Sequence, residues 1–242
     1  MPLSTTPEIS APPPPTPSPD GLPTPARYYA MATVLCGIAL TVLDGSVMNL
    51  ALPGVSNDLH VSASMVIWVV NAYQIAILTL LLPLARIGDL YGYKKVYLSG
   101  LALFTLASLG CVLSRSLEQL IVARVLQGLG GAGMFGINAA LVRSIYPRRL
   151  LGQGIAINSI VVGMASVAGP SVAALVLSVA SWPWLFAINL PIGLFVFFLG
   201  IRSLPAERVA KPRAERFSFV DMALNIAMFS ALFLGVDRLV PR

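Results

Sequence analysis

Long apolar runs separated by short polar breaks fill the chain from Tyr28 onward. A helix needs about 20 residues to cross the roughly 30 Å hydrocarbon core of a bilayer. Seven runs approach this length and almost none shows a polar face, which argues against a buried soluble bundle. We therefore predict seven membrane-spanning helices. The predicted spans are Tyr28–Pro53, Met65–Leu84, Val96–Ser114, Leu117–Ala140, Ile155–Leu177, Pro183–Gly200 and Phe219–Leu239.

These runs divide the chain into four parts. Residues 1–26 include ten prolines, and such a segment buries too little apolar surface to order itself, so we predict a disordered tail in the cytoplasm. Residues 27–202 contain six spans. Residues 203–218 are predicted to be a cytoplasmic linker, and residues 219–242 hold the seventh span and the chain end.

The composition confirms the membrane class and gives an orientation. Of the 242 residues, 57% are hydrophobic and 11% are charged, against about 25% charged in a soluble domain. This disfavours a soluble enzyme, a nucleic-acid binder and a secreted disulfide scaffold. Twelve of the 16 basic residues precede the first span or follow an even-numbered one. Because cytoplasmic loops carry the excess of Lys and Arg, we expect a cytoplasmic N-terminus, a bacterial inner membrane, the lipid bilayer as partner and no nucleic acid.

Two charges lie well inside the predicted spans. Asp44 in span one and Arg124 in span four lie about 14 Å and about 11 Å from the same outer face at 1.5 Å per residue. Their similar depth allows a direct or water-bridged pair. Ionisable groups within a membrane mark ion or substrate paths, so Asp44 is a candidate proton carrier. The alternative is a static pair that fixes helix packing.

Uncharged polar and small residues in the spans suggest a cavity and close helix contacts. Residues Gly128, Ala132 and Gly136, and again Ala165, Gly169 and Ala173, form ridges that let another helix approach closely. Pro170 removes a backbone hydrogen bond and is expected to kink span five. The candidate cavity-lining residues are Asn49, Asn71, Tyr73 and Gln127.

The loop between spans two and three resembles a family signature. From Ala85 to Lys95 it reads ARIGDLYGYKK, which is similar to the G-x-x-x-D-R-x-G-R-K-x motif of the major facilitator superfamily. Ala85 replaces the first glycine of that motif, and Leu90 and Tyr93 replace basic residues. The resemblance implies an inner-gate loop formed by Gly88, Asp89, Gly92, Lys94 and Lys95.

Four further segments resemble the same superfamily, each at the expected span. RVLQG from Arg124 looks like the span-four motif tied to proton coupling. Gly169-Pro170 resembles the antiporter motif of span five. LDGSVMNLALP from Leu43 and SWPWLFAINLPIG from Ser181 are similar to motifs of the fourteen-span drug:proton antiporter branch.

The resemblance implies an all-α membrane protein. Its fold would be the six-helix N-terminal bundle of a major facilitator, built of 3+3 inverted repeats, plus a seventh transmembrane helix. Asp44 and Arg124 would couple protons to export of an apolar or cationic compound, and Gly169 and Pro170 would form the antiporter-type kink. The proton gradient is the expected energy source. No cofactor, metal site or enzyme activity is expected.

The length bears on this expectation, because a complete member of the branch needs about twice this chain. We expect a truncated N-terminal half of a drug exporter, with a small-molecule substrate and a second transporter half as partners. The alternative is a non-transporting membrane subunit or modulator that pairs with another half. A seven-span receptor is disfavoured, since span seven has no lysine for a retinal Schiff base.

Overall fold

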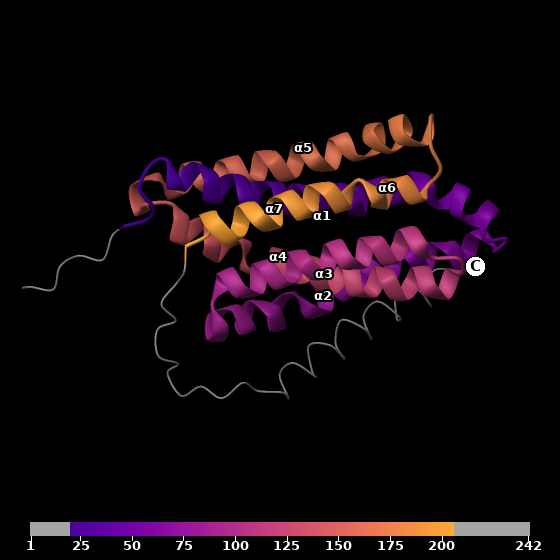
Figure 1. Ribbon diagram of the computed structural model, residues 1–242, viewed down its shortest axis with the longest axis horizontal. Helices are drawn as coiled ribbons and strands as arrows, with labels where there is room; N and C mark the ends of the chain where they lie inside the picture. Colours follow the sequence, from indigo (N-terminus) through magenta and orange to yellow (C-terminus); the bar gives the residue numbers. More distant parts are fainter. Residues whose placement is uncertain (1–19, 206–242) are drawn as a thin grey trace, which may run out of the picture.

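The computed structural model describes residues 20–205, which form a bundle of helices running along one long axis (Figure 1). Six stretches within the described residues are long and apolar enough to cross a membrane, which confirms the first six predicted spans. The predicted span 219–239, residues 1–19 of the tail and residues 206–218 of the linker lie outside the described residues. The elements are α1 (Ala26–Asp58), α2 (Ala63–Tyr91), α3 (Tyr93–Leu113), α4 (Leu117–Ile145), the 3-10 turn η1 (Arg148–Leu150), α5 (Leu151–Leu177), α6 (Pro183–Ala187) and α7 (Asn189–Ser203).

Several helices extend beyond the predicted boundaries. Helix α1 was predicted to end at Pro53 but continues to Asp58, giving 33 residues or about 50 Å. A proline inside a helix forfeits the bond to the carbonyl four residues back, here that of Asn49. One lost bond does not end a long helix whose other turns are intact, so the boundary at Pro53 was wrong.

The sixth span, predicted as one run, is interrupted at Ile188 between α6 and α7. Pro191 has no N–H to donate to the carbonyl of Ala187. The regular bond pattern therefore fails one turn before the proline. The interruption places Asn189 at the first position of α7.

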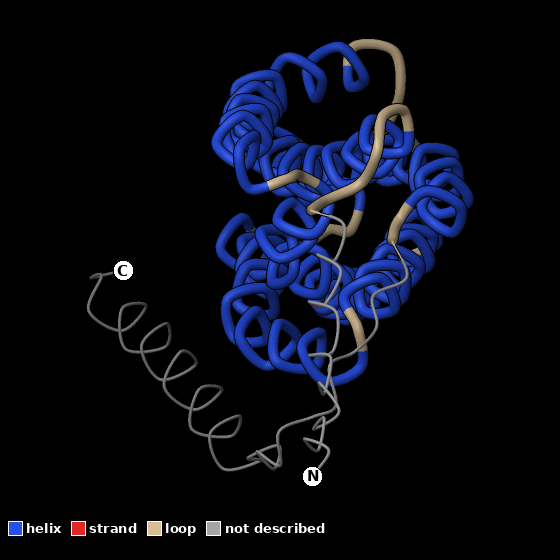
Figure 2. The backbone as a smooth tube through the Cα atoms, turned by 90° about the vertical axis from the view of Figure 1, so that its left-hand side faces the viewer, coloured by secondary structure: helices blue, strands red, loops and turns tan. Residues whose placement is uncertain are grey.

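The helices form two groups of three spans. Helix α1 packs mainly against α5 and α7, and α4 packs mainly against α2 and α3. Figure 1 shows α1, α5, α6 and α7 along one side of the bundle and α2, α3 and α4 along the other, and Figure 2 views the helices end on. Exchanging spans one, two and three with four, five and six converts one group into the other, as 3+3 inverted repeats require.

Small residues permit the closest helix contacts. A Cβ on Gly130 of α4 would lie 2.5 Å from the backbone nitrogen of Phe104 in α3, and one on Gly128 would lie 2.7 Å from Ala76 in α2. Gly128 belongs to the predicted ridge of α4, and a Cβ on Gly136 of the same ridge would lie 2.6 Å from the carbonyl oxygen of Leu81 in α2, so the ridge is confirmed as a contact surface. The ridge of α5 is also confirmed, because Ala165, Gly169 and Ala173 are three of the four buried residues of that helix.

The end of the predicted tail is packed rather than disordered. The backbone nitrogen of Leu22 donates to the carbonyl of Ile145 (2.9 Å), and the Asp20 carboxylate accepts from the backbone nitrogen of Arg148 (3.2 Å). Gly21 has a φ of +79°, and a Cβ there would meet the backbone of Pro147. The prediction for residues 20–26 is corrected accordingly: these contacts order the segment despite its prolines.

Candidate functional site: a buried charge network beside an open cavity

Asp44 of α1 and Arg124 of α4 form a direct ion pair in the interior of the bundle. An Arg124 Nη1 hydrogen bond reaches Asp44 Oδ2, and both side chains are 0% exposed. The pair joins the two groups of helices, since α1 and α4 belong to different groups. Of the arrangements that the sequence left open, the structure shows direct contact. A role in proton coupling stays a prediction.

The Arg124 guanidinium is held on several sides. Its Nε donates to the carbonyl of Val69 (3.2 Å), and its carbon atom lies 4.0 Å from the ring centre of Tyr73 and 5.6 Å from that of Phe186. A desolvated cation over an aromatic face is attracted by the ring quadrupole. Arg124 Nη2 is buried and makes no hydrogen bond with any described residue.

Gln127 extends the pair into a network. Its Oε1 accepts from Arg124 Nη1 (2.7 Å), and its Nε2 donates to Asp44 Oδ1 and to Ser108 Oγ, both at 2.9 Å. The spacing of three residues places Arg124 and Gln127 on one face of α4. Gln127 was expected to line a cavity. It is instead fully buried within the network.

Three members of this network were not recognised as site residues from the sequence. Asn189 Nδ2 donates to Asp44 Oδ1 (2.7 Å), Ser108 Oγ accepts from Gln127, and the Cys111 thiol donates to Gln127 Oε1 (3.7 Å). All three are buried. These three side chains are uncharged, so the pattern of intramembrane charges does not mark them, although Asn189 lies inside the SWPWLFAINLPIG segment. It is the polar residue of a long apolar run, and that signal could have found it.

The electrostatics favour the network as a unit. Asp44 accepts from Arg124, Gln127 and Asn189, so its carboxylate is satisfied as an anion. Removing two charges from water is costly, and a buried pair is tolerated only when further hydrogen bonds complete it. Loss of any one partner leaves a charge or a polar group unmatched in the bilayer interior.

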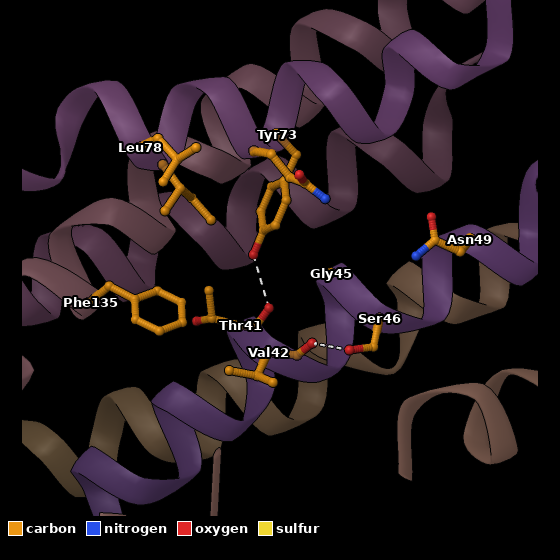
Figure 3. A pocket seen from close by; sticks show the side chains of 10 residues that line it. Thr41, Val42, Gly45, Ser46, Asn49, Tyr73, Leu78 and Phe135 are labelled. Atoms are coloured by element: carbon orange, nitrogen blue, oxygen red, sulfur yellow. Dashed lines mark hydrogen bonds between the residues drawn. The ribbon is translucent and has the colours of Figure 1, made fainter. Parts of the chain in front are cut away.

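An open cavity of about 440 Å³ lies beside the network, between α1, α2 and α4. Figure 3 shows Tyr73 pointing from α2 toward α1, where its hydroxyl donates to the carbonyl of Thr41 (2.9 Å). The Tyr73 ring lines the cavity and also contacts Arg124, so it lies between them. Asn49 lines the cavity as expected, whereas Asn71 does not. The wall consists of the uncharged residues Thr41, Val42, Gly45, Ser46, Asn49, Tyr73, Gln74, Ile77, Leu78 and Phe135.

The expected inner-gate loop forms a tight junction between α2 and α3. Gly92 alone separates the helices, with a φ of +99° that favours glycine. A Cβ on Gly88 would lie 2.6 Å from Ile137 of α4. Asp89 accepts a hydrogen bond from the Tyr93 hydroxyl (2.7 Å) and lies 3.8 Å from Arg86. Asp89 also lines an open cavity of about 520 Å³ between α2 and α4.

The two lysines of this loop differ in their surroundings. Lys94 Nζ donates to the carbonyls of Ile201 (2.7 Å) and Leu204 (2.9 Å) at the C-terminus of α7. A cation at a helix C-terminus satisfies orphan carbonyls and opposes the helix dipole. Lys94 thereby connects the first and second repeats. Lys95 is exposed.

The antiporter-type segment of α5 contacts α1. Gly169 lies so close to Ser46 that a Cβ would overlap the Ser46 side chain. The helix is continuous through Pro170, which cannot donate to the carbonyl of Ser166. The structure thus places Gly169 at a helix contact, next to one wall of the 440 Å³ cavity.

Within residues 20–205, no three His, Cys, Asp or Glu side chains gather as metal ligands.

Comparison with known proteins decides the family. The family model of the Major Facilitator Superfamily matches residues 34–239. This chain belongs to the major facilitator superfamily. The matched region includes the ion pair, the cavity and the inner-gate loop.

Relatives within the superfamily cover most of this chain. It is 49% identical over 218 residues to the uncharacterized transporter YebQ of Escherichia coli, and covers 48% of that protein. It is 34% identical over 187 residues to the tetracenomycin C resistance and export protein of Streptomyces glaucescens, and covers 35% of it. The matches include 89% and 76% of this chain. The chain thus spans about half the length, or less, of these superfamily relatives.

A solved superfamily structure supports the fold. The human organic anion transporter MFSD10 superposes with a TM-score of 0.60 at 18% identity, over 86% of this chain and 55% of the human one. At this identity the likeness concerns the fold alone.

Proposed function

We propose that this chain is the N-terminal part of a proton-coupled exporter of drugs or other small apolar or cationic compounds. The observation that carries the proposal is the wholly buried pair of Asp44 and Arg124 beside an uncharged cavity. A carboxylate at this depth is expensive to maintain and marks an ion path by default.

Protonation supplies a mechanism for coupling. A proton taken up by the Asp44 carboxylate removes its negative charge and weakens the hold on Arg124, which stays charged. The pair joins α1 and α4, from opposite groups of the bundle, so its strength biases how the groups pack. Tyr73 contacts Arg124 and lines the cavity, and therefore connects the charge state to a bound substrate.

The substrate class follows from the cavity wall and from one relative. The wall combines aromatic and aliphatic side chains with two amides and carries no charge, which suits an apolar molecule with a few hydrogen-bonding groups. A relative that is 34% identical is named for resistance to, and export of, tetracenomycin C. We extend that chemistry to this chain as part of the proposal.

Orientation and gating complete the proposal. Every described basic residue except Arg115 and Arg124 lies at one end of the bundle. Under the positive-inside rule this end faces the cytoplasm, together with the N-terminus, in a bacterial inner membrane. The loop around Asp89 and Lys94 lies at the same end and would latch the inner gate. A second transporter half would close the substrate path, and the proton gradient would drive transport.

Transport in inverted membrane vesicles tests the function. Vesicles are prepared from cells that express the chain from its own gene, and a proton gradient is established across their membrane. The uptake of ethidium and of tetracenomycin C is then measured together with the accompanying proton movement. We expect Asp44→Asn and Arg124→Ala to abolish proton-coupled uptake of at least one compound, whereas Arg115→Ala, at the opposite end of the bundle, retains it. Unchanged proton-coupled uptake in both interior variants would overturn the proposal.

A matched cross-linking experiment addresses the second half. Cysteine-specific cross-linking in the same membranes, with Cys36 as the exposed thiol, should recover a second membrane chain wherever the 242-residue chain supports transport. Robust transport by an uncross-linked monomer would contradict the need for that half.

A further inference from the structure

The two amides that hold Asp44 differ in their freedom to turn. Gln127 is fixed at both ends, since its Oε1 accepts from Arg124 and from Cys111 while its Nε2 donates to Asp44 and Ser108. Reversing this amide would place an NH₂ group against the guanidinium. Gln127 is therefore pinned in one orientation by a neighbouring cation.

Asn189 is held at one end only. Its Nδ2 donates to Asp44 Oδ1 (2.7 Å) and lies 3.5 Å from Ser108 Oγ. Among residues 20–205, no donor reaches Asn189 Oδ1. The residue is 5% exposed, and its Oδ1 remains an unused acceptor beside the Asp44 carboxylate.

The position of Asn189 in the chain adds a second element of freedom. It is the first residue of α7, directly after the interruption at Ile188 that Pro191 imposes. An amide carries an acceptor on one arm and donors on the other. A half-turn about the terminal torsion exchanges them without moving the backbone.

We infer that Asn189 is a positioning residue whose amide changes orientation when Asp44 is protonated. Its Nδ2 donates to the ionised carboxylate. After a half-turn of the amide, its Oδ1 accepts a hydrogen bond from the neutral acid. In the charged state, Asn189 Nδ2 donates to Asp44 Oδ1 as observed. When a proton from water binds Oδ1, the new O–H needs an acceptor, and the turned Asn189 Oδ1 supplies it. Loss of the proton to water restores the starting arrangement.

Among the groups around Asp44, Asn189 is the one that we expect to accept a hydrogen bond from the neutral acid. The titratable and charged groups around Asp44 are Arg124 from α4, Tyr73 from α2 and Cys111 from α3. Helices α5 and α6 carry no charged residue, and α7 carries only Arg202 at its far end. Ser108 already donates to the carbonyl of Phe104 (2.8 Å) and serves the amides as an acceptor. Asn189 is thus an uncharged partner that can either donate a hydrogen bond to Asp44 or accept one from it.

The inference rests on the proposed proton coupling, but its direct test needs no substrate. The chain is reconstituted in lipid nanodiscs, and the infrared carbonyl stretch of protonated Asp44 is followed as a function of pH. The signal is assigned by its loss in Asp44→Asn. In Asn189→Leu, which matches the size of the amide but cannot hydrogen-bond, the stretch should move to higher frequency because the acid has lost its acceptor.

The pH profile of the same signal gives a second readout. The charged carboxylate loses a stronger hydrogen bond than the neutral acid does, so in Asn189→Leu half-protonation should move upward by about one pH unit. Asn189→Gln, which keeps an amide on a longer stem, should return both readouts toward the parent. Thr105→Val is the matched control: this residue of α3 contacts Gly193 of α7 but lies outside the network, and it should change neither readout.

The outcomes separate the two proposals. If the Asp44 signal titrates but Asn189→Leu leaves its frequency and pH profile unchanged, the inference fails and the proposed function stands. The inference also fails if Thr105→Val shifts both readouts as much as Asn189→Leu. If no protonated Asp44 signal develops at any pH at which the protein stays folded, both proposals fail. A carbonyl stretch that responds to Asn189→Leu in a chain whose transport survives Asp44→Asn would retain the amide switch and overturn proton coupling.

Discussion

Helices α4 and α5 have similar lengths and similar ridges of small residues, yet one is enclosed and the other is mostly exposed. Fifteen of the 29 residues of α4 are buried, against four of the 27 residues of α5. The buried positions of α5 include the ridge Ala165, Gly169 and Ala173. Those of α4 include glycines that face both α2 and α3. Small-residue spacing therefore determines how closely one neighbour approaches, and it does not determine how many neighbours a helix has.

The two helices differ in polarity as well. Helix α4 carries Arg124 and Gln127 into the bundle interior, whereas α5 has no charged residue. A charge in a membrane needs partners from other helices, so the polar face of α4 requires a central position. Helix α5 has no such requirement and contacts mainly α1.

The largest expected difference in stability between the two helices comes from replacing one glycine by alanine in each. In Gly130→Ala the new Cβ would lie 2.5 Å from the backbone of Gly100 and Phe104, which cannot move aside as a flexible side chain can. We expect a loss of more than about 4 kcal/mol of unfolding free energy, measured by thermal unfolding of the purified chain in detergent. Gly163→Ala in α5 meets no atom within 4 Å and should gain up to about 1 kcal/mol. Equal effects at the two sites would break the comparison.

The next effect concerns the polar face of α4. Arg124→Leu leaves the Asp44 carboxylate buried without its cation, which should cost about 3–5 kcal/mol of unfolding free energy. The double variant Arg124→Leu with Asp44→Leu removes both charges and should recover most of this loss, without recovering proton-coupled uptake. If the double variant were as unstable as the single one, packing rather than charge would explain the central position of α4.

The smallest effect tests the single close contact of α5. Gly169→Ala forces its Cβ into Ser46 of α1 and should cost about 1–3 kcal/mol, the usual range for overpacking. Ser46→Gly in the same chain removes the obstructing side chain and should restore stability. Gly152→Ala, which meets nothing within 4 Å, is the matched control in the same helix. A loss in Gly169→Ala that Ser46→Gly fails to relieve would show that the α1–α5 contact is not the cause.

Much of the fold could be read from the sequence, because a bilayer permits few structures. The lengths of the apolar runs predicted six described spans, and the depths of Asp44 and Arg124 in their spans allowed the contact that the structure shows. The end of α1 and the interruption at Ile188 were misjudged. In both places the consequence of a proline depends on whether the surrounding turns stay intact, and periodicity does not report this.

The candidate site was only partly accessible to sequence reasoning. Gln127 was expected on a cavity wall and lies in the charge network, Asn71 does not line the cavity, and Ser108 and Asn189 were missed as members of the site. An uncharged amide or hydroxyl in a span can face lipid, a cavity or a partner. Which of these it faces depends on the rotation of its helix, and small residues leave several rotations open.

By itself, the sequence determined the membrane class, the spans, the glycine ridges and the two charges that must find partners in an apolar medium. These follow from composition and spacing, since lipid cannot form hydrogen bonds with backbone N–H and C=O groups or solvate a charge. Only the tertiary structure decided which groups satisfy Asp44. Its partners are Arg124 and Gln127 of α4 and Asn189 of α7, two helices that lie far from Asp44 in the sequence. The helix packing that brings them together leaves no local pattern in the sequence.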